Sequence, residues 1–241
     1  GQVEGERMTQ VAERPVDEAE PDVPRDPLRV RVWVVVVVAT LLQLVPRLYG
    51  QLGGWFFADD FWRQDAAARQ SAWEIALQGQ GGHVAPINYW LMHAWASVTP
   101  FQWGMQVVAT AALWIVADVA VVLAFRALWG WGWPTAAAYA CYAVSTFTLP
   151  SFLWASQVWL GSMAVLSLAL LVLGTARALR APSAARTLTA VGLLVLALLL
   201  SERAAFEAVL VGLLGIVAYA DRAGGLRAFA RRAWPLYAAS A

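Results

Sequence analysis

The sequence predicts an all-α, polytopic membrane protein. Hydrophobic residues make up 60% of the 241 residues and charged residues only 14%, whereas charged residues make up roughly 25% of a soluble domain. Apolar runs of about 20 residues, the length that crosses a bilayer as a helix, recur along the chain. The 14 tryptophans fit this class, because the indole ring favours the membrane–water interface.

Two regions differ in composition. Residues 1–27 are acidic and contain several prolines but few apolar side chains, so we expect a disordered N-terminal tail. Residues 28–241 form one predicted transmembrane module. Its last residues follow a basic stretch at 222–232 and show no terminating feature, which leaves open a missing C-terminal part or a partner subunit.

Six membrane spans are predicted in this module. They cover 28–49, about 104–125, two spans within the charge-free stretch 127–176 that turn near 148–151, about 182–201 and about 204–220. The first loop, about 50–103, is too long for a turn. "DDFWRQDAAARQSAWEIALQ" has an acidic start and apolar residues at near-helical spacing, which predicts one amphipathic helix in the interface. "GQGGHVAP" ends it, and "INYWLMHAWASV" predicts a second interfacial helix.

The distribution of arginine predicts the orientation. Cytoplasmic flanks of membrane helices are enriched in Arg and Lys. With the N-terminus inside, eleven arginines fall on inner flanks and four on outer segments. This arrangement predicts a cytoplasmic N-terminus. It also places Asp59, Asp60, His83, Glu202 and Arg203 together on the outer face. The absence of lysine and the excess of Ala, Val, Leu, Trp and Arg are typical of a bacterial protein, which we expect in the inner membrane.

The adjacent carboxylates Asp59 and Asp60 have two interpretations. Either could cap the interfacial helix, because Asp at a helix start accepts hydrogen bonds from free backbone N–H groups. Alternatively, one of them is a general base whose pKa is tuned by the surrounding aromatic residues. The two roles are compatible, because neighbouring side chains point in different directions.

Four further residues are candidates for substrate binding. His83 lies between glycines and a proline, and it is either an exposed loop residue or close to a phosphate or a sugar hydroxyl. Glu202 and Arg203 are either charges of a solvated turn or a pair in which Arg203 binds phosphate and Glu202 orients it, since guanidinium suits phosphate. Arg63 is assigned with them to substrate binding. Asp118, inside a span, is equally consistent with a structural and a functional role.

Several function classes are not supported. The net charge of +1 and the absence of a basic patch or motif argue against a nucleic-acid partner. The sequence contains no metal-ligand spacing, phosphate-binding loop, dinucleotide fingerprint or nucleophile elbow.

Three segments in this order resemble the GT-C membrane glycosyltransferases: "FADDFW" after the first span, "GGHVAPINYWL" closing the first outer loop, and "LLLSERAAFEAVL" between later spans. The resemblance implies a polyprenyl-phosphate sugar donor, a usually inverting reaction, and a glycan, lipid or protein acceptor. Asp59 would be the preferred base and Asp60 the second choice, and Arg203 would stabilise the leaving phosphate. Participation of a divalent cation is left open.

The leading functional prediction is therefore a glycosyltransferase that acts on the cell envelope at the outer face of the membrane. The alternative is a non-catalytic membrane module that binds a polyprenyl lipid or a partner subunit. A small-molecule transporter ranks last, because the chain has no convincing internal repeat.

Overall fold

The computed structural model describes residues 27–57, 59–78, 83–145, 155–181 and 183–219, together with positions 227, 228, 230, 231 and 234. The predicted tail, the predicted turn at 148–151 and the glycines before His83 lie outside the described residues. The described part is all-α. Its helices are α1 (Pro27–Gln51), α2 (Asp59–Arg69), α3 (Ala72–Gln78), α4 (Pro86–Val98), α5 (Trp103–Trp129), α6 (Trp133–Val144), α7 (Ala155–Arg180), α8 (Ala184–Leu200) and α9 (Ala204–Tyr219).

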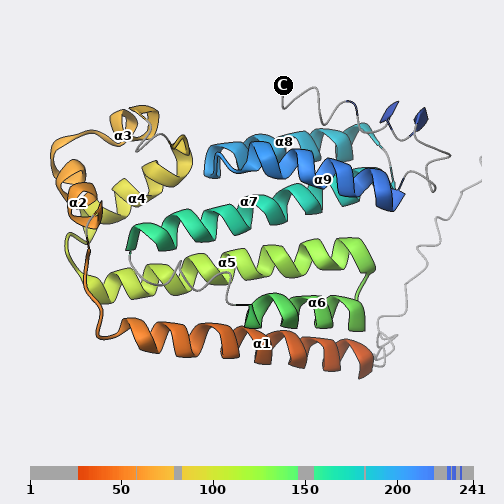
Figure 1. Cartoon of the computed structure of the whole chain (residues 1–241), viewed down its shortest axis with the longest axis horizontal. Helices are drawn as coiled ribbons and strands as arrows, with labels where there is room; N and C mark the ends of the chain where they lie inside the picture. The colour runs from red at the N-terminus through yellow and green to blue at the C-terminus, as the bar shows by residue number, and fades with distance from the viewer. Residues whose placement is uncertain are drawn as a thin grey trace, which may run out of the picture.

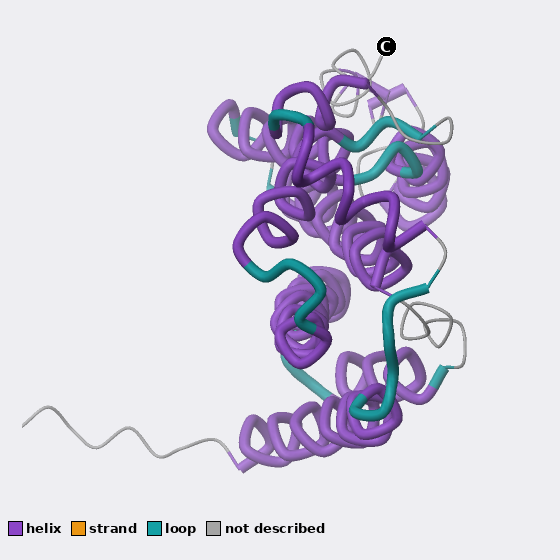
Figure 2. Tube along the Cα trace, turned by 90° about the vertical axis from the view of Figure 1, so that its left-hand side faces the viewer, coloured by secondary structure: helices purple, strands orange, loops and turns teal. Residues whose placement is uncertain are grey.

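The helices form a bundle with a cap of short helices at one end. Figure 1 shows α1, α5, α7, α8 and α9 running lengthwise beside one another, with α2, α3 and α4 gathered at the left. Figure 2 shows the same molecule from that end, so that several of the long helices are seen along their axes. We call this the capped end of the bundle, and the other the opposite end.

Three helices are long and apolar enough to cross a membrane: α1, α5 and the segment Gln157–Arg180 of α7. The chain is thus a multi-pass membrane protein. The predicted spans at 28–49 and 104–125 correspond to α1 and α5. The spans predicted at 182–201 and 204–220 correspond to the shorter apolar helices α8 and α9.

The sequence predicts two spans within 127–176; the second corresponds to α7, and the first, at α6, is shorter than expected. Helix α6 has 12 residues, which at about 1.5 Å per residue is roughly 18 Å. The hydrocarbon core of a bilayer is about 30 Å thick, so α6 alone cannot cross it. It packs along α1 and α5 and is joined to α5 by a hydrogen bond from Tyr142 Oη to Asp118 Oδ1 (3.0 Å).

The first loop also differs from the prediction, because its first amphipathic segment forms two helices and not one. The Ser71 N–H donates to Glu74 Oε2 (2.7 Å), and the Glu74 N–H donates to Ser71 Oγ (3.3 Å). This reciprocal pair is a capping box, which satisfies free donors at a helix start. It ends the continuity of α2 and begins α3 at Ala72.

The core of the bundle is centred on α7, which packs against α5 on one side and against α8 and α9 on the other. Trp114 of α5 is fully buried, as are Val158 and Ser167 of α7. In contrast, α1 carries large exposed apolar residues over most of its length, including Trp33, Val34, Val37, Val38, Leu41 and Leu42. An apolar surface of this extent is unusual for a soluble protein and is the expected surface of a helix in contact with lipid.

Helices α7 and α8 approach closely at Gly174. A Cβ atom at this position would lie 3.2 Å from Ala190 Cα and 3.3 Å from Leu193 Cδ1. Small residues at such contacts let membrane helices pack closely.

Gly174→Val should therefore lower stability by about 1–3 kcal/mol through overpacking. Thermal unfolding of the purified protein in detergent measures this. Gly192→Val on α8 is the matched control, because a Cβ there meets nothing within 4 Å. Equal losses of stability in both variants would show that overpacking at Gly174 is not the cause.

Candidate functional site

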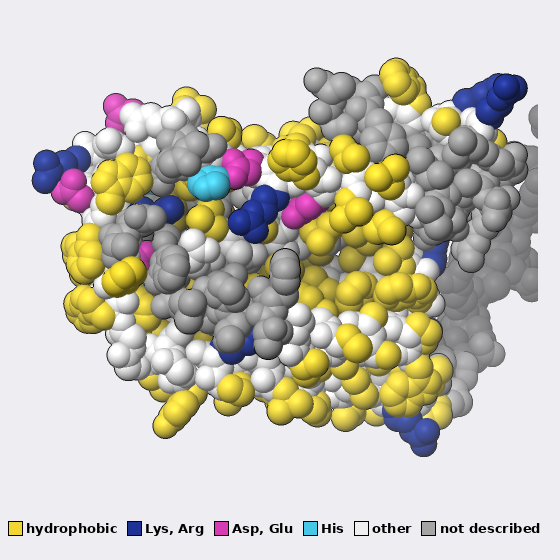
Figure 3. All heavy atoms as spheres, in the orientation of Figure 1, with side chains coloured by type: hydrophobic (Ala, Val, Ile, Leu, Met, Phe, Trp, Pro, Cys, Tyr) yellow, Lys and Arg dark blue, Asp and Glu magenta, His cyan; other side chains and the backbone are white. Residues whose placement is uncertain are grey.

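Polar side chains gather at the capped end of the bundle, where the first loop meets α7 and the α8–α9 turn. In the space-filling view, acidic and basic side chains and a histidine lie over this side of the molecule, whereas apolar side chains cover much of the rest of the visible face (Figure 3). Two groups can be distinguished there. One is built around Asp60 and Arg63 of α2, and the other around Glu202 and His83.

Asp60 lies in the first turn of α2 and is only 2% exposed. Its Oδ2 accepts hydrogen bonds from the Phe57 N–H (3.0 Å) and from the Ala155 N–H (3.3 Å). Ala155 is the first residue of α7, where backbone N–H groups have no partner within the helix. Asp60 therefore caps α7 across a sequence separation of 95 residues. This extends the capping role predicted from the sequence, because the helix that Asp60 caps is α7.

The aromatic residues around the acidic pair have two separate roles. Phe56 is buried and makes edge contacts with Trp103 and Phe101, with ring centroids 5.3 Å and 5.7 Å apart. It therefore fixes the loop against the start of α5. Trp55, Phe57, Phe61 and Trp62 remain 47–63% exposed. Such side chains suit a membrane–water interface.

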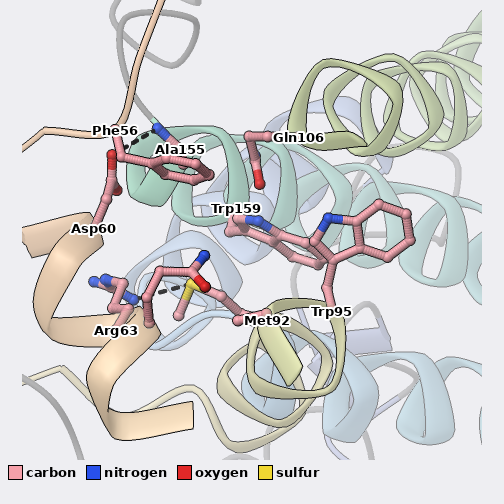
Figure 4. Close-up of a pocket in the computed structure, with 10 residues that line it drawn as sticks. Phe56, Asp60, Arg63, Met92, Trp95, Gln106, Ala155 and Trp159 are labelled. Atoms are coloured by element: carbon pink, nitrogen blue, oxygen red, sulfur yellow. Dashed lines mark hydrogen bonds between the residues drawn. The ribbon is translucent and has the colours of Figure 1, made fainter. Parts of the chain in front are cut away.

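A small pocket of about 20 Å³ lies beside Asp60. It is lined by Phe56, Asp60, Arg63, Gln64, Met92, Trp95, Ala96, Gln106, Ala155 and Trp159. This volume holds about one water molecule. Figure 4 shows Asp60 and Arg63 on one wall, Gln106 opposite, and the indoles of Trp95 and Trp159 closing the far side.

Gln106 supplies the strongest sign that the pocket receives a polar ligand. Its side chain is 5% exposed, and its Nε2 has no hydrogen-bond partner among the described residues. Buried polar atoms are nearly always hydrogen-bonded, so an exception needs an explanation such as water or a ligand. The sequence analysis did not single out Gln106, although a polar residue inside the apolar run 104–125 was a usable signal.

Arg63 is held by residues of α4. Its Nη1 lies 3.1 Å from Met92 Sδ, and its guanidinium carbon lies 5.9 Å from the centroid of the Tyr89 ring. Tyr89 is fully buried, and its hydroxyl has no hydrogen-bond partner among the described residues. Burial raises the pKa of Tyr89, an effect that Arg63 opposes and Glu202 reinforces. The Tyr89 hydroxyl is therefore a neutral donor near both charged groups.

The second group joins the first loop to the α8–α9 turn. Glu202 Oε1 pairs with His83 Nδ1, and Glu202 Oε2 accepts a hydrogen bond from the Val84 N–H (2.9 Å). Burial raises the pKa of Glu202, but the hydrogen bonds from His83 and Val84 and the charges of His83 and Arg203 outweigh it. The pKa of Glu202 therefore lies below its ordinary value.

Arg203 is exposed, and the structure gives it no ion pair with another described residue. Its charge nevertheless acts on Glu202 and on Glu207. Glu207 accepts a hydrogen bond from Ser167 Oγ of α7 (2.9 Å). The guanidinium of Arg203 thus stands at the surface between two carboxylates that are themselves engaged elsewhere.

The structure therefore brings only some of the predicted site residues into contact with one another. Asp60 and Arg63 line one pocket, while His83 and Glu202 form a direct pair outside its lining. The side chain of Asp59 lies outside the described residues. Among those residues, no group of three His, Cys, Asp or Glu side chains could hold a metal ion.

Comparison of the chain with protein-family models, with curated proteins and with solved structures finds no significant match. The evidence for a function therefore comes from the residues of the site.

The Glu202 contacts predict a pH-dependent contribution to stability. Because the folded-state pKa of Glu202 is lowered from 4.5, its contacts stabilise the fold above that value, and this contribution is lost as the pH falls through the folded-state pKa. At pH 7, Glu202→Gln should unfold at a lower temperature than the unmodified protein. The difference should shrink progressively below about pH 4.5.

The control for this measurement is Asp65→Asn, which removes an exposed carboxylate paired only with Arg69 in the next turn of the same helix. If Glu202→Gln lowers the unfolding temperature by the same amount at pH 7 and at pH 4, the ionised form of Glu202 does not stabilise the fold as proposed.

Proposed function

We propose that this chain is a membrane glycosyltransferase of the GT-C type. It moves a sugar from a polyprenyl-phosphate donor to a cell-envelope acceptor at the outer face of a bacterial inner membrane. The observation that carries the proposal is the small pocket at the capped end of the bundle. There Asp60 and Arg63 converge with Gln106, whose Nε2 has no hydrogen-bond partner among the described residues. A carboxylate, a guanidinium and an amide are the groups needed to bind a sugar and a phosphate and to accept a proton.

In the proposed reaction, an acceptor hydroxyl attacks the anomeric carbon of the donor. The bond between that carbon and the phosphate oxygen breaks, and polyprenyl phosphate leaves with the electron pair. The hydroxyl proton passes to a carboxylate of the Asp59–Asp60 pair. Asp60 lies in the pocket wall, where the two backbone donors fix its orientation, and it is the member of the pair that we propose as the base.

Two arginines, Arg63 in the pocket wall and Arg203 at the α8–α9 turn, would act on the donor phosphate. Charge grows on this phosphate as the bond breaks, and a positioned guanidinium stabilises that charge. Arg203 is exposed beside α9, whose apolar residues Phe206, Val209 and Leu210 are also exposed. A polyprenyl chain lying along this face would bring its phosphate to Arg203 and its sugar toward the first loop, with His83 and Glu202 between them.

The pocket must open for this reaction, because about 20 Å³ admits a water molecule but not a sugar. Its walls come from α2, α4, α5 and α7. Separation of α2 and α4 from α7 would enlarge it. The small volume also favours the second candidate, a non-catalytic module that binds a polyprenyl lipid or a partner subunit.

Transfer of radiolabelled sugar from polyprenyl-phosphate donors to a cell-envelope extract tests the proposal, with the protein in nanodiscs. Asp60→Asn should lower the rate by about 10²-fold or more, since general base catalysis contributes about 10²–10⁴-fold. Asp59→Asn is measured beside it. Asp65→Asn, an exposed carboxylate on the same helix, should remain within about twofold. Full activity in both pair variants would exclude Asp59 and Asp60 as the base.

Arg203→Ala should weaken donor binding by about tenfold or more, the loss expected for a hydrogen bond to a charged group. Binding of the labelled donor to the same nanodiscs measures it. Tight donor binding with no transfer by any variant or by the unmodified protein would instead support the lipid-binding module.

The proposed orientation has its own test. The substitution Cys141→Ser first removes the exposed native thiol. In this background, the cysteine introduced by Asp65→Cys should react with an impermeant maleimide added to intact spheroplasts. Cysteine at the exposed Ala185 should react only after the membrane is permeabilised. The reverse pattern would contradict an outer location for the pocket.

A further inference from the structure

A second polar site lies at the opposite end of the bundle. Between the end of α7 and the start of α8 the structure contains a groove of about 420 Å³, lined by Gly174, Arg177, Arg180, Arg186 and Thr189. Ligand sites typically have volumes of about 300–1,000 Å³. We call this the arginine groove. It does not depend on the proposed glycosyltransferase activity.

At the groove, α7 and α8 pack tightly against each other, and three cationic side chains line the space. Gly174 has no side chain to fill the space, and a Cβ there would already lie 3.2 Å from Ala190 Cα. The position must therefore stay small for α7 and α8 to pack as they do. Arg177 and Arg180 come from the last turn of α7, and Arg186 from the first turn of α8.

The charge of the groove is not balanced by carboxylates of the described chain. Arg180 Nη2 donates to the Leu128 carbonyl oxygen, and Arg186 Nη1 donates to the Ala181 carbonyl oxygen (3.0 Å). These are backbone contacts, and the ion pairs of the described residues lie elsewhere. All three arginines are exposed, and each guanidinium has more N–H donors than these contacts use.

The location of the groove identifies the kind of anion. The apolar stretch of α7 that can cross a membrane ends at Arg180, so the arginines stand where the hydrocarbon region gives way to headgroups. Guanidinium groups bind phosphate oxygens through parallel N–H bonds. Basic pockets between membrane helices bind anionic headgroups.

We propose that the arginine groove binds the phosphate headgroup of an anionic membrane phospholipid. Arg177 and Arg186, from the two walls, hold the phosphate between α7 and α8. The acyl chains lie against exposed apolar residues of α8 such as Leu188. A bound lipid would thereby fasten the contact between α7 and α8 at this end of the bundle.

Native mass spectrometry of the detergent-purified chain, titrated with phosphatidylglycerol or phosphatidylcholine, tests this proposal. The unmodified protein should retain phosphatidylglycerol preferentially. Arg177→Gln/Arg186→Gln should bind it about tenfold or more weakly, since each arginine near an anionic headgroup contributes about 1 kcal/mol. The matched control is Arg29→Gln/Arg31→Gln, which removes two charges from the start of α1 at the same end of the bundle.

Comparison of the two double variants distinguishes binding at the groove from a general effect of positive charge on lipid binding. The control should lose less than about threefold in phosphatidylglycerol binding. Equal losses in both double variants, or unchanged binding in the groove variant, would overturn the proposal. Arg177→Lys/Arg186→Lys keeps the charge without the planar fork and should bind with intermediate strength. It therefore tests the site even if the glutamine variant folds poorly.

Inorganic phosphate distinguishes the source of the anion. It should compete with phosphatidylglycerol only weakly, because it lacks the acyl chains that contact α8. If phosphate displaces the lipid at similar concentration, or binds in its place while phosphatidylglycerol shows no preference, the groove is a site for free phosphate and the lipid proposal is wrong.

Discussion

The carboxylate of Asp60 connects the first loop to the helix bundle. One oxygen accepts hydrogen bonds from Phe57, where the first loop turns into α2, and from Ala155, the first residue of α7. Helix α7 in turn packs against α5, α8 and α9. The loop that carries the proposed site is therefore anchored to the central helix through a charged acceptor. A buried group of this kind is costly to remove, because the backbone donors it serves would be left without partners.

The Glu202 clamp is a second, more exposed connection between the same loop and the bundle. It joins His83 and Val84 to the α8–α9 turn, and its strength depends on the ionisation of an accessible carboxylate. The two connections differ in burial: Asp60 is 2% exposed and the Glu202 side chain is 34% exposed. Opening of the pocket for a substrate would thus be easier at the Glu202 side than at the Asp60 side. This difference gives a direction to the proposed separation of α2 and α4 from α7.

The charged groups of the described bundle are separated along its length. The carboxylates other than Asp118 lie at the capped end, on α2, α3, the α8–α9 turn and the first turn of α9. The arginine groove lies at the opposite end. In a membrane protein this separation places each set of charges near water or headgroups and leaves the apolar length of the helices in lipid. It also provides two chemically different sites, one with carboxylate, amide and guanidinium groups and one with guanidinium groups alone.

The sequence by itself determined the class of the protein, because burial in lipid requires long apolar runs, and such runs are local features. It located α1, α5 and the beginning of α9 closely, and it singled out Asp60, Arg63 and Glu202 as candidate site residues. The division of α2 from α3 was also encoded locally, in the Ser71–Glu74 spacing, although the continuous pattern of apolar residues obscured it. Only the tertiary structure decided which residues meet. Ala155 reaches Asp60 across 95 residues and Glu202 reaches His83 across 119, and Gln106 becomes part of the pocket because α5 packs beside α7. These contacts depend on helix packing across distant segments, which no local pattern of residues specifies.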